Sequence, residues 1–207
     1  MTSTPRVLVT GFEPFGGASL NSSQLVVEWL EAKTLVGLHF AVLPVEYEES
    51  VKEASALIDS IDPEIIISLG QAEGREKVSF ERVAINLDDA GIADNGGLLR
   101  RDRAIVEGGE AAHMASLPVR KIVDRLLTDG HPVAESLSAG AFVCNHLFYS
   151  LLAELKETRS DRWMGFVHLP LMTEQGEEFP GKPTLSREVQ GKTIEAAIEL
   201  SRELRRS

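Results

Sequence analysis

The stretch Glu64-Ile65-Ile66-Ile67-Ser68-Leu69-Gly70 decides the expected fold. Its continuous apolar run ends at a glycine and is typical of a strand that is buried on both faces of a sheet. Just before it, residues 48–60 have the spacing of an amphipathic helix, and short segments at 6–10 and 40–45 are strand-like. Strands that alternate with helices in this way predict an α/β sandwich around a mostly parallel or mixed sheet.

The same alternation continues along the rest of the chain. Further helices are expected over 21–33, 119–128, 142–156 and 184–205, and further strands over 79–86, 133–137 and 163–169. Residues 87–110 and 171–182 are expected to be loops. The length suits one hydrophobic core, so we expect residues 1–207 to form a single domain. In sheets of this kind the active site lies at the carboxyl ends of strands.

The composition argues against several classes of partner. The net charge of −11 disfavours binding to nucleic acid or to anionic membranes, because both need a basic face. No apolar run reaches the roughly 18 residues of a membrane span. The N-terminus passes directly into strand-like Val7-Leu8-Val9, so no signal peptide is expected. Together with an unpaired cysteine, this predicts a cytoplasmic protein.

Cys144 is the only cysteine of the chain and lies in Phe142-Val143-Cys144-Asn145-His146, in the first turn of an expected helix. A lone thiol forms neither an intramolecular disulfide nor a cysteine zinc site. Cys144 is therefore either a small buried core residue or a nucleophile. A helix N-terminus is expected to lower the pKa of a thiol, which would favour the nucleophile.

A cysteine nucleophile needs a base, and His168 is the best placed of the five histidines. It follows Gly165-Phe166-Val167 at the end of an apolar strand, where a loop begins. His146 lies two residues from Cys144, a spacing that points side chains apart on a helix. The other histidines lie in polar or turn-like context: His39, His113 and His131.

An acid that orients the imidazole is expected on the strand over 79–86. Glu81 has apolar neighbours there, where a carboxylate needs a partner. Arg82 is a poor partner, because successive residues of a strand point to opposite faces of the sheet. Alternative acids follow the strand: Asp88, Asp89 and Asp94.

The loop Gly11-Phe12-Glu13-Pro14-Phe15-Gly16-Gly17 presents two aromatic rings. Phe12 and Phe15 either plug the end of the sheet or, with Phe142, form a slot for a flat ligand. Pro14 and the bulky rings argue against a phosphate-binding loop. No His-Glu-x-x-His motif or paired-histidine spacing occurs, so neither a metal nor another cofactor is expected.

Together these motifs resemble the pyroglutamyl peptidase I family, also called the pyrrolidone-carboxylate peptidases. The matching segments are, in order, 11–16 with Asn21, 81–86, 138–146, and 165–170 with Glu174-Gln175. They have compatible spacing and run from about residue 6 to the final helix. Four independent motifs are a far more specific signal than any one of them.

The resemblance implies a cysteine peptidase that removes N-terminal pyroglutamate from peptides. It assigns the nucleophile to Cys144, the base to His168 and the orienting acid to Glu81. The residues that it places around the lactam ring are Phe12, Phe15, Asn21, Gln71 and Phe142. It also implies a three-layer α/β/α sandwich, a cytoplasmic location and a homo-oligomer, either a dimer or a tetramer.

Two segments depart from the family's pattern. Gly91 stands where the family usually has an arginine, and the usual glycine pair after Gly70 is altered in Gln71-Ala72-Glu73-Gly74-Arg75. We expect activity to persist, with a cation supplied by Arg100, Arg101 or Arg103, and Gly91→Arg to raise kcat/KM. The alternative functions are a cysteine amidohydrolase acting on another lactam or amide, and a non-catalytic binder of cyclised N-termini.

Overall fold

A computed structural model describes residues 4–158 and 160–206 of the chain. The helices are α1 (Ser22–Glu31), α2 (Tyr47–Ile61), α3 (Val119–Thr128), α4 (Val143–Glu157) and α5 (Arg187–Arg206), with a 3-10 turn η1 (Thr173–Gln175). The main sheet contains β1 (Val7–Phe12), β2 (Leu38–Leu43), β3 (Ile65–Gln71), β4 (Val78–Glu81), β7 (Val133–Ser136) and β8 (Trp163–Leu169). The shorter strands outside it are β5 (Val83–Ile85), β6 (Ala112–Met114), β9 (Leu171–Met172) and β10 (Thr184–Leu185).

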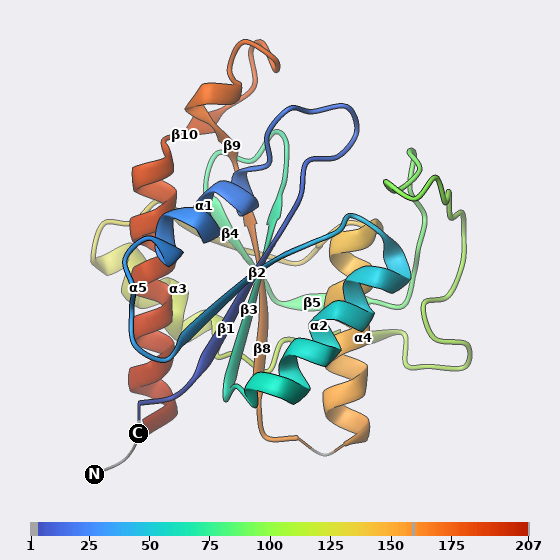
Figure 1. Ribbon diagram of the computed structural model, residues 1–207, viewed down its shortest axis with the longest axis horizontal. Helices are drawn as coiled ribbons and strands as arrows, with labels where there is room; N and C mark the ends of the chain where they lie inside the picture. Colours follow the sequence, from blue (N-terminus) through green and yellow to red (C-terminus); the bar gives the residue numbers. More distant parts are fainter. Residues whose placement is uncertain (1–3, 159, 207) are drawn as a thin grey trace.

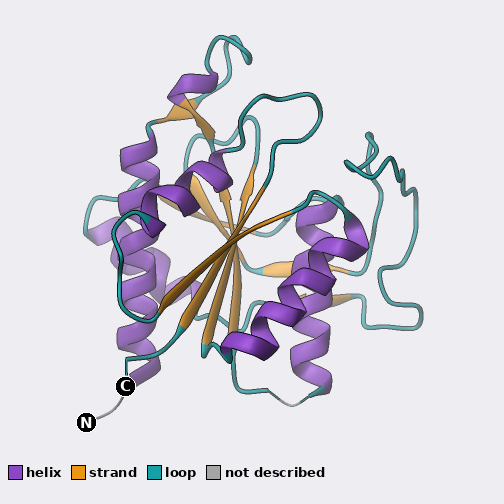
Figure 2. Ribbon diagram, in the orientation of Figure 1, coloured by secondary structure: helices purple, strands orange, loops and turns teal. Residues whose placement is uncertain are grey.

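The main sheet has the strand order β2-β1-β3-β8-β4-β7. Neighbouring strands are parallel except β4, which runs antiparallel to β8 and parallel to β7. The sheet is seen nearly edge-on in Figures 1 and 2, with α2 and α4 on one side and α1, α3 and α5 on the other. The predicted three-layer α/β/α sandwich with a mostly parallel, mixed sheet is confirmed.

The apolar run of β3 fills both layers of the core. Ile65 and Ile67 pack in the cluster beneath α1, α3 and α5, whereas Ile66 packs in the cluster beneath α2 and α4. All three isoleucines are fully buried. Side chains of a strand alternate between faces, so an unbroken apolar run is what a strand covered by helices on both sides requires.

The expected strand over 79–86 divides at Arg82. β4 stays in the main sheet, while β5 leaves it and pairs antiparallel with β6, a strand that the sequence analysis did not predict. The division follows from the hydrogen bonds of Arg82, whose N–H donates to Ser136 O and whose carbonyl accepts from Ala115 N. At Arg82 the backbone thus changes its partner from β7 to the residue that follows β6.

The start of the last helix also differs from expectation. Thr184 and Leu185 form β10 and pair with β9, so α5 begins at Arg187 instead of 184. β9 and η1 lie within the segment expected to be a loop. Within residues 4–158 and 160–206, no helix is both long and apolar enough to cross a membrane.

Candidate active site

Cys144 is the second residue of α4, and its thiol packs on the end of β3. A Cβ built on Gly70 would lie 2.8 Å from Cys144 Sγ and 3.0 Å from the Phe166 ring. Only glycine leaves room for so close an approach. The sulfur therefore lies against the sheet at the carboxyl end of a central strand, where the sequence predicted the active site.

His168 lies beside this point on the neighbouring strand. It is the register partner of Gly70 in the parallel pair β3–β8, so its side chain leaves the sheet on the same face as a Cβ at Gly70 would. The Phe166 ring, which touches that same position, is 5.0 Å from the His168 ring between centroids. The structure thus brings the imidazole and the thiol to one face of the sheet.

Glu81, at the end of β4, binds this imidazole. His168 Nδ1 donates to Glu81 Oε1 at 2.9 Å, which leaves the other ring nitrogen, Nε2, for a second proton partner. Glu81 is fully buried and His168 is 5% exposed. The alternative acids lie elsewhere: Asp88 binds His146, Asp94 accepts from the Tyr47 and Leu98 amides, and Asp89 lies 3.6 Å from Arg101.

The buried Glu81 carboxylate has a cationic partner that the sequence analysis missed. Arg75 Nη2 donates to Glu81 Oε1 at 3.2 Å, and also to Ser136 Oγ at 3.2 Å and to the Ser138 carbonyl at 3.1 Å. Arg82 pairs with Glu135 instead. Arg75 therefore links the acid that binds His168 to the segment that leads into α4 and Cys144.

The expected lowering of the thiol pKa is wrong. Burial, with a smaller contribution from the Glu81 carboxylate, raises the pKa of Cys144 to about 12, and a backbone N–H at the helix start offsets this only in part. Desolvation of a sulfur anion outweighs the helix N-terminus here. At neutral pH the sulfur is therefore a neutral thiol, and a nucleophilic role for Cys144 requires a base that removes its proton.

A small apolar cavity opens beside the thiol, with an empty space of about 220 Å³. Its lining comprises every predicted pocket residue, together with Val45 and Val143: Phe12, Phe15, Asn21, Val45, Gln71, Phe142, Val143 and Cys144. The Phe15 and Phe142 rings lie 5.9 Å apart between centroids. An uncharged lining with two facing aromatic rings suits a small, flat group.

The two polar side chains of the lining are held by their own neighbours. Asn21 is the N-cap of α1, accepting from Ser23 N at 2.9 Å and donating to Glu13 O at 2.8 Å. Gln71 Oε1 accepts from Ser22 N and from Gln175 Nε2, each at 2.9 Å. These bonds fix the loops around the cavity.

The backbone of Gln71 faces the cavity side of β3. The Ala72 N–H donates to Leu169 O on β8, so by alternation the N–H and C=O of Gln71 point toward β1. β1 pairs with β3 only as far as Thr10↔Ser68 and then continues beside β2. The cavity lies where β1 and β3 part, and sequence reasoning missed these main-chain groups because no residue type marks them.

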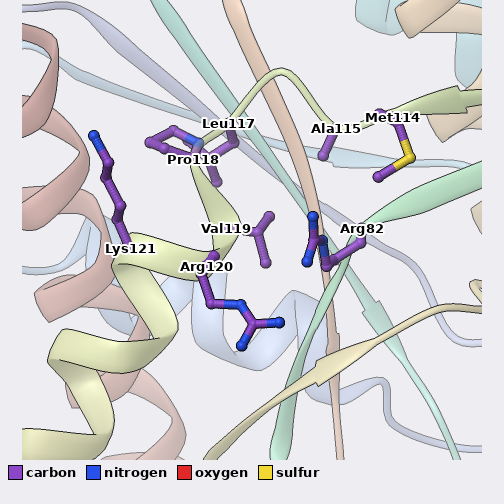
Figure 3. Close-up of a pocket in the computed structure, with 8 residues that line it drawn as sticks. All are labelled: Arg82, Met114, Ala115, Leu117, Pro118, Val119, Arg120 and Lys121. Atoms are coloured by element: carbon purple, nitrogen blue, oxygen red, sulfur yellow. The ribbon is translucent and has the colours of Figure 1, made fainter.

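A larger concavity, with an empty space of about 530 Å³, lies near the start of α3 (Figure 3). Its basic residues include Arg82 and Arg120, but both pair with Glu135. The eight residues that line it include no cysteine, histidine or acid. We therefore place the candidate active site at the smaller cavity beside Cys144. Among residues 4–158 and 160–206, no group of three His, Cys, Asp or Glu side chains is arranged to hold a metal ion.

Comparisons with known proteins agree on one family. The sequence model of the pyroglutamyl peptidase family matches residues 5–203. A pyrrolidone-carboxylate peptidase of Bacillus cereus is 44% identical over 197 residues, covering 94% of this chain and 92% of the relative.

Two solved structures are also closely similar to this fold. Pyroglutamyl peptidase I of Bacillus amyloliquefaciens superposes with a TM-score of 0.91 at 36% identity, covering 97% of this chain and 96% of the other. The pyrrolidone carboxyl peptidase of Fervidobacterium islandicum AW-1 gives a TM-score of 0.92 at 33% identity, covering 96% and 99% of the two chains.

Proposed function

Because this chain belongs to the pyroglutamyl peptidase family, we propose that it is a cysteine exopeptidase that removes N-terminal pyroglutamate from peptides. Cys144 is the nucleophile, His168 the general base and acid, and Glu81 the group that orients His168. The observation that carries these roles is the Glu81–His168 hydrogen bond, which leaves one imidazole nitrogen free on the face of the sheet where the thiol packs.

In the first half of the reaction, His168 Nε2 takes the Cys144 proton as the sulfur attacks the carbonyl carbon of the pyroglutamyl residue. The imidazolium then gives this proton to the leaving amine, the C–N bond breaks, and a thioester remains on Cys144. In the second half, His168 takes a proton from water, which attacks the thioester. The C–S bond breaks, pyroglutamate leaves, and the imidazolium returns its proton to the sulfur, which restores the thiol.

The start of α4 supports this chemistry through its backbone. The N-cap Phe142 contributes no side-chain hydrogen bond, and the first-turn amides of a helix have no partner within the helix. Such amides stabilise an oxyanion that forms next to them. We assign the oxyanion of the tetrahedral intermediate to this turn, which also carries the attacking sulfur.

Specificity follows from the lining of the cavity. A lactam is flat and neutral, and it carries an N–H and a C=O that suit the N–H and C=O of Gln71. Aromatic rings at Phe15 and Phe142 cover its faces. None of the eight lining residues is charged, so the α-ammonium of an uncyclised N-terminus would lose its water without gaining a counter-charge.

A chromogenic pyroglutamyl amide tests the proposal directly. We expect turnover of this substrate, no turnover of the glutaminyl amide, and no turnover by Cys144→Ala that retains its fold. Turnover of other amides in preference to the pyroglutamyl one would indicate a general cysteine amidohydrolase. Tight binding of pyroglutamyl peptides without turnover would indicate a non-catalytic binder.

The setting of the enzyme is part of the same proposal. We place it in the cytoplasm, where a free thiol persists, and expect it to form a dimer or tetramer of identical chains, as the family resemblance implies. Size-exclusion chromatography with light scattering measures the assembly.

A further inference from the structure

A second group of buried charges lies outside the Cys144, His168 and Glu81 site. Asp88 is fully buried, and its Oδ2 accepts from His146 Nδ1 at 2.9 Å and from Arg100 Nη1 at 2.8 Å. Arg100 is 9% exposed and also pairs with Glu48. We call Asp88, His146 and Arg100 the Asp88 cluster.

Together with Glu48, the Asp88 cluster joins three separate parts of the chain. His146 belongs to the first turns of α4, Glu48 to the first turn of α2, and Asp88 and Arg100 to the long connection between β5 and β6. Backbone bonds hold the same connection together: Asp88 and Arg103 form a bridge, and Ala90 N donates to Arg100 O at 3.1 Å. The cluster thus anchors the 88–103 loop to both helix starts.

Aromatic contacts connect this anchor to the cavity. The Arg100 guanidinium lies 4.6 Å above the centre of the Tyr47 ring, and that ring meets Phe142 edge-on at 5.7 Å. Phe142 is one wall of the cavity and faces Phe15 across it. The loop also reaches the residue before this wall, since Asp89 N donates to Ala141 O at 3.0 Å.

Buried charges are an expensive way to fill this space. An apolar set of similar volume would give comparable or greater stability, whereas removing one partner leaves the others uncompensated. What charges add is a defined arrangement, because guanidinium and carboxylate groups meet in few geometries. The arrangement fixed here is that of the loop, Tyr47 and Phe142.

We infer that Arg100 is a positioning residue for the substrate cavity, which it serves by clamping the 88–103 loop and the Tyr47–Phe142 wall through the Asp88 cluster. This inference rests on the proposed function for its substrate. Arg100 does not line the cavity and does not act on the reacting atoms.

Kinetics on a pyroglutamyl amide and hydrogen exchange over residues 88–103 test the inference together. Arg100→Met keeps the length of the stem and removes the charge. We expect it to raise KM about 10-fold or more, to change kcat by less than about 3-fold, and to speed exchange of the loop amides. Arg100→Lys keeps the charge without the planar fork and should give an intermediate KM. Arg101→Met is the matched control, because Arg101 is 60% exposed, and it should behave as the wild type.

The outcomes separate this inference from the proposed function. Unchanged KM and unchanged exchange in Arg100→Met overturn the clamp, as does a fall in kcat at constant KM. If Arg100→Met does not fold, Glu48→Gln removes only the exposed partner and should raise KM in the same direction; no rise overturns the clamp. If the wild type turns over no pyroglutamyl amide, the proposed function fails, and loop exchange in the Arg100 variants alone decides whether the clamp exists.

Discussion

The molecule contains two buried carboxylate–imidazole pairs that are almost identical as pairs. Glu81 binds His168 and Asp88 binds His146, each at 2.9 Å, and each carboxylate also accepts from an arginine, Arg75 or Arg100. In each carboxylate the second oxygen is buried and has no partner among the described residues.

The two pairs differ in what lies on the other side of the imidazole. His168 projects from β8 on the face of the sheet where the Cys144 sulfur packs, whereas the His146 ring meets the Tyr47 ring at 5.3 Å. A carboxylate–imidazole pair therefore does not identify a catalytic site by itself. Under the proposed function, the group beyond the imidazole decides whether the pair moves a proton or holds a loop.

Replacing each of the two histidines separately by alanine should give the largest difference in kcat. His168→Ala is expected to lower kcat by about 10²- to 10⁴-fold, because it removes general acid–base catalysis. His146→Ala should leave kcat within about 3-fold, because its ring does not face the sulfur. Steady-state kinetics on a pyroglutamyl amide measure both variants. An inactive His146→Ala beside an active His168→Ala would reverse the roles of the two pairs.

Neutralising the two acids should affect different properties: Glu81→Gln mainly kcat, and Asp88→Asn mainly the free energy of unfolding. Glu81→Gln keeps the shape of the side chain and should lower kcat about 10²-fold or more, since the imidazole loses its orienting charge. Asp88→Asn should retain most of kcat but lose on the order of 3 kcal/mol of unfolding free energy, because Arg100 loses its buried partner. Urea denaturation measures the stability of each variant, and steady-state kinetics measure its kcat. Equal losses of kcat in the two variants would mean that both acids serve catalysis to the same extent.

Arg75, the arginine of the Glu81–His168 pair, should contribute less to kcat than Glu81, the acid that it binds. Arg75→Met is expected to lower kcat about 10-fold, since it frees both Glu81 and the Ser138 carbonyl that precedes Cys144. Arg82→Met is a matched control, because both side chains are 33% exposed and Arg82 pairs with Glu135 away from the site. An identical loss in both variants would point to a general effect of removing surface charge.

The raised pKa of Cys144 predicts a pH effect on stability. The thiol has a pKa of about 12 in the folded chain and near 9.0 ordinarily. Below pH 9 it is protonated in folded and unfolded chains alike, so its stabilising contribution to the free energy of unfolding is fully present there. Between about pH 9 and 12 the thiol ionises only in unfolded chains, so the free energy of unfolding falls as the pH rises. Above about pH 9 the wild type should lose no more than about 1.4 kcal/mol per pH unit relative to Cys144→Ala. Parallel slopes for the two proteins in urea denaturation would show that the thiol pKa is not raised.

Gly91 should show the smallest effect. The family pattern predicts that Gly91→Arg raises kcat/KM, but a Cβ at this position has no neighbour within 4 Å. A side chain at this position starts in open space, and a charge that stays in solvent contributes little. We now expect kcat/KM to change by less than about 3-fold. A larger gain would mean that catalysis benefits from a cation at position 91 and that no arginine of the native chain replaces it.

Strand and helix periodicity was sufficient to predict the layers of the fold, whereas the grouping of Cys144, His168 and Glu81 came from the resemblance to the pyroglutamyl peptidase I family. The sequence was insufficient where distant loops meet. Arg75 became the partner of Glu81 only through the turn after β3, and β6 emerged from a stretch with no strand periodicity. The direction of the Cys144 pKa shift also escaped prediction, because it depends on how deeply the sulfur is buried.

The single cysteine has a consequence for oxidative damage. A thiolate oxidises to a sulfenic acid, which a second thiol captures as a disulfide or which proceeds to irreversible sulfinic and sulfonic acids. This chain has no second cysteine to capture it. Its sulfur is instead kept protonated between turnovers by the raised pKa, and a protonated thiol reacts slowly with oxidants. The raised pKa of Cys144 is thus also its protection against peroxide, and substitutions that lower this pKa should speed an irreversible loss of activity under peroxide.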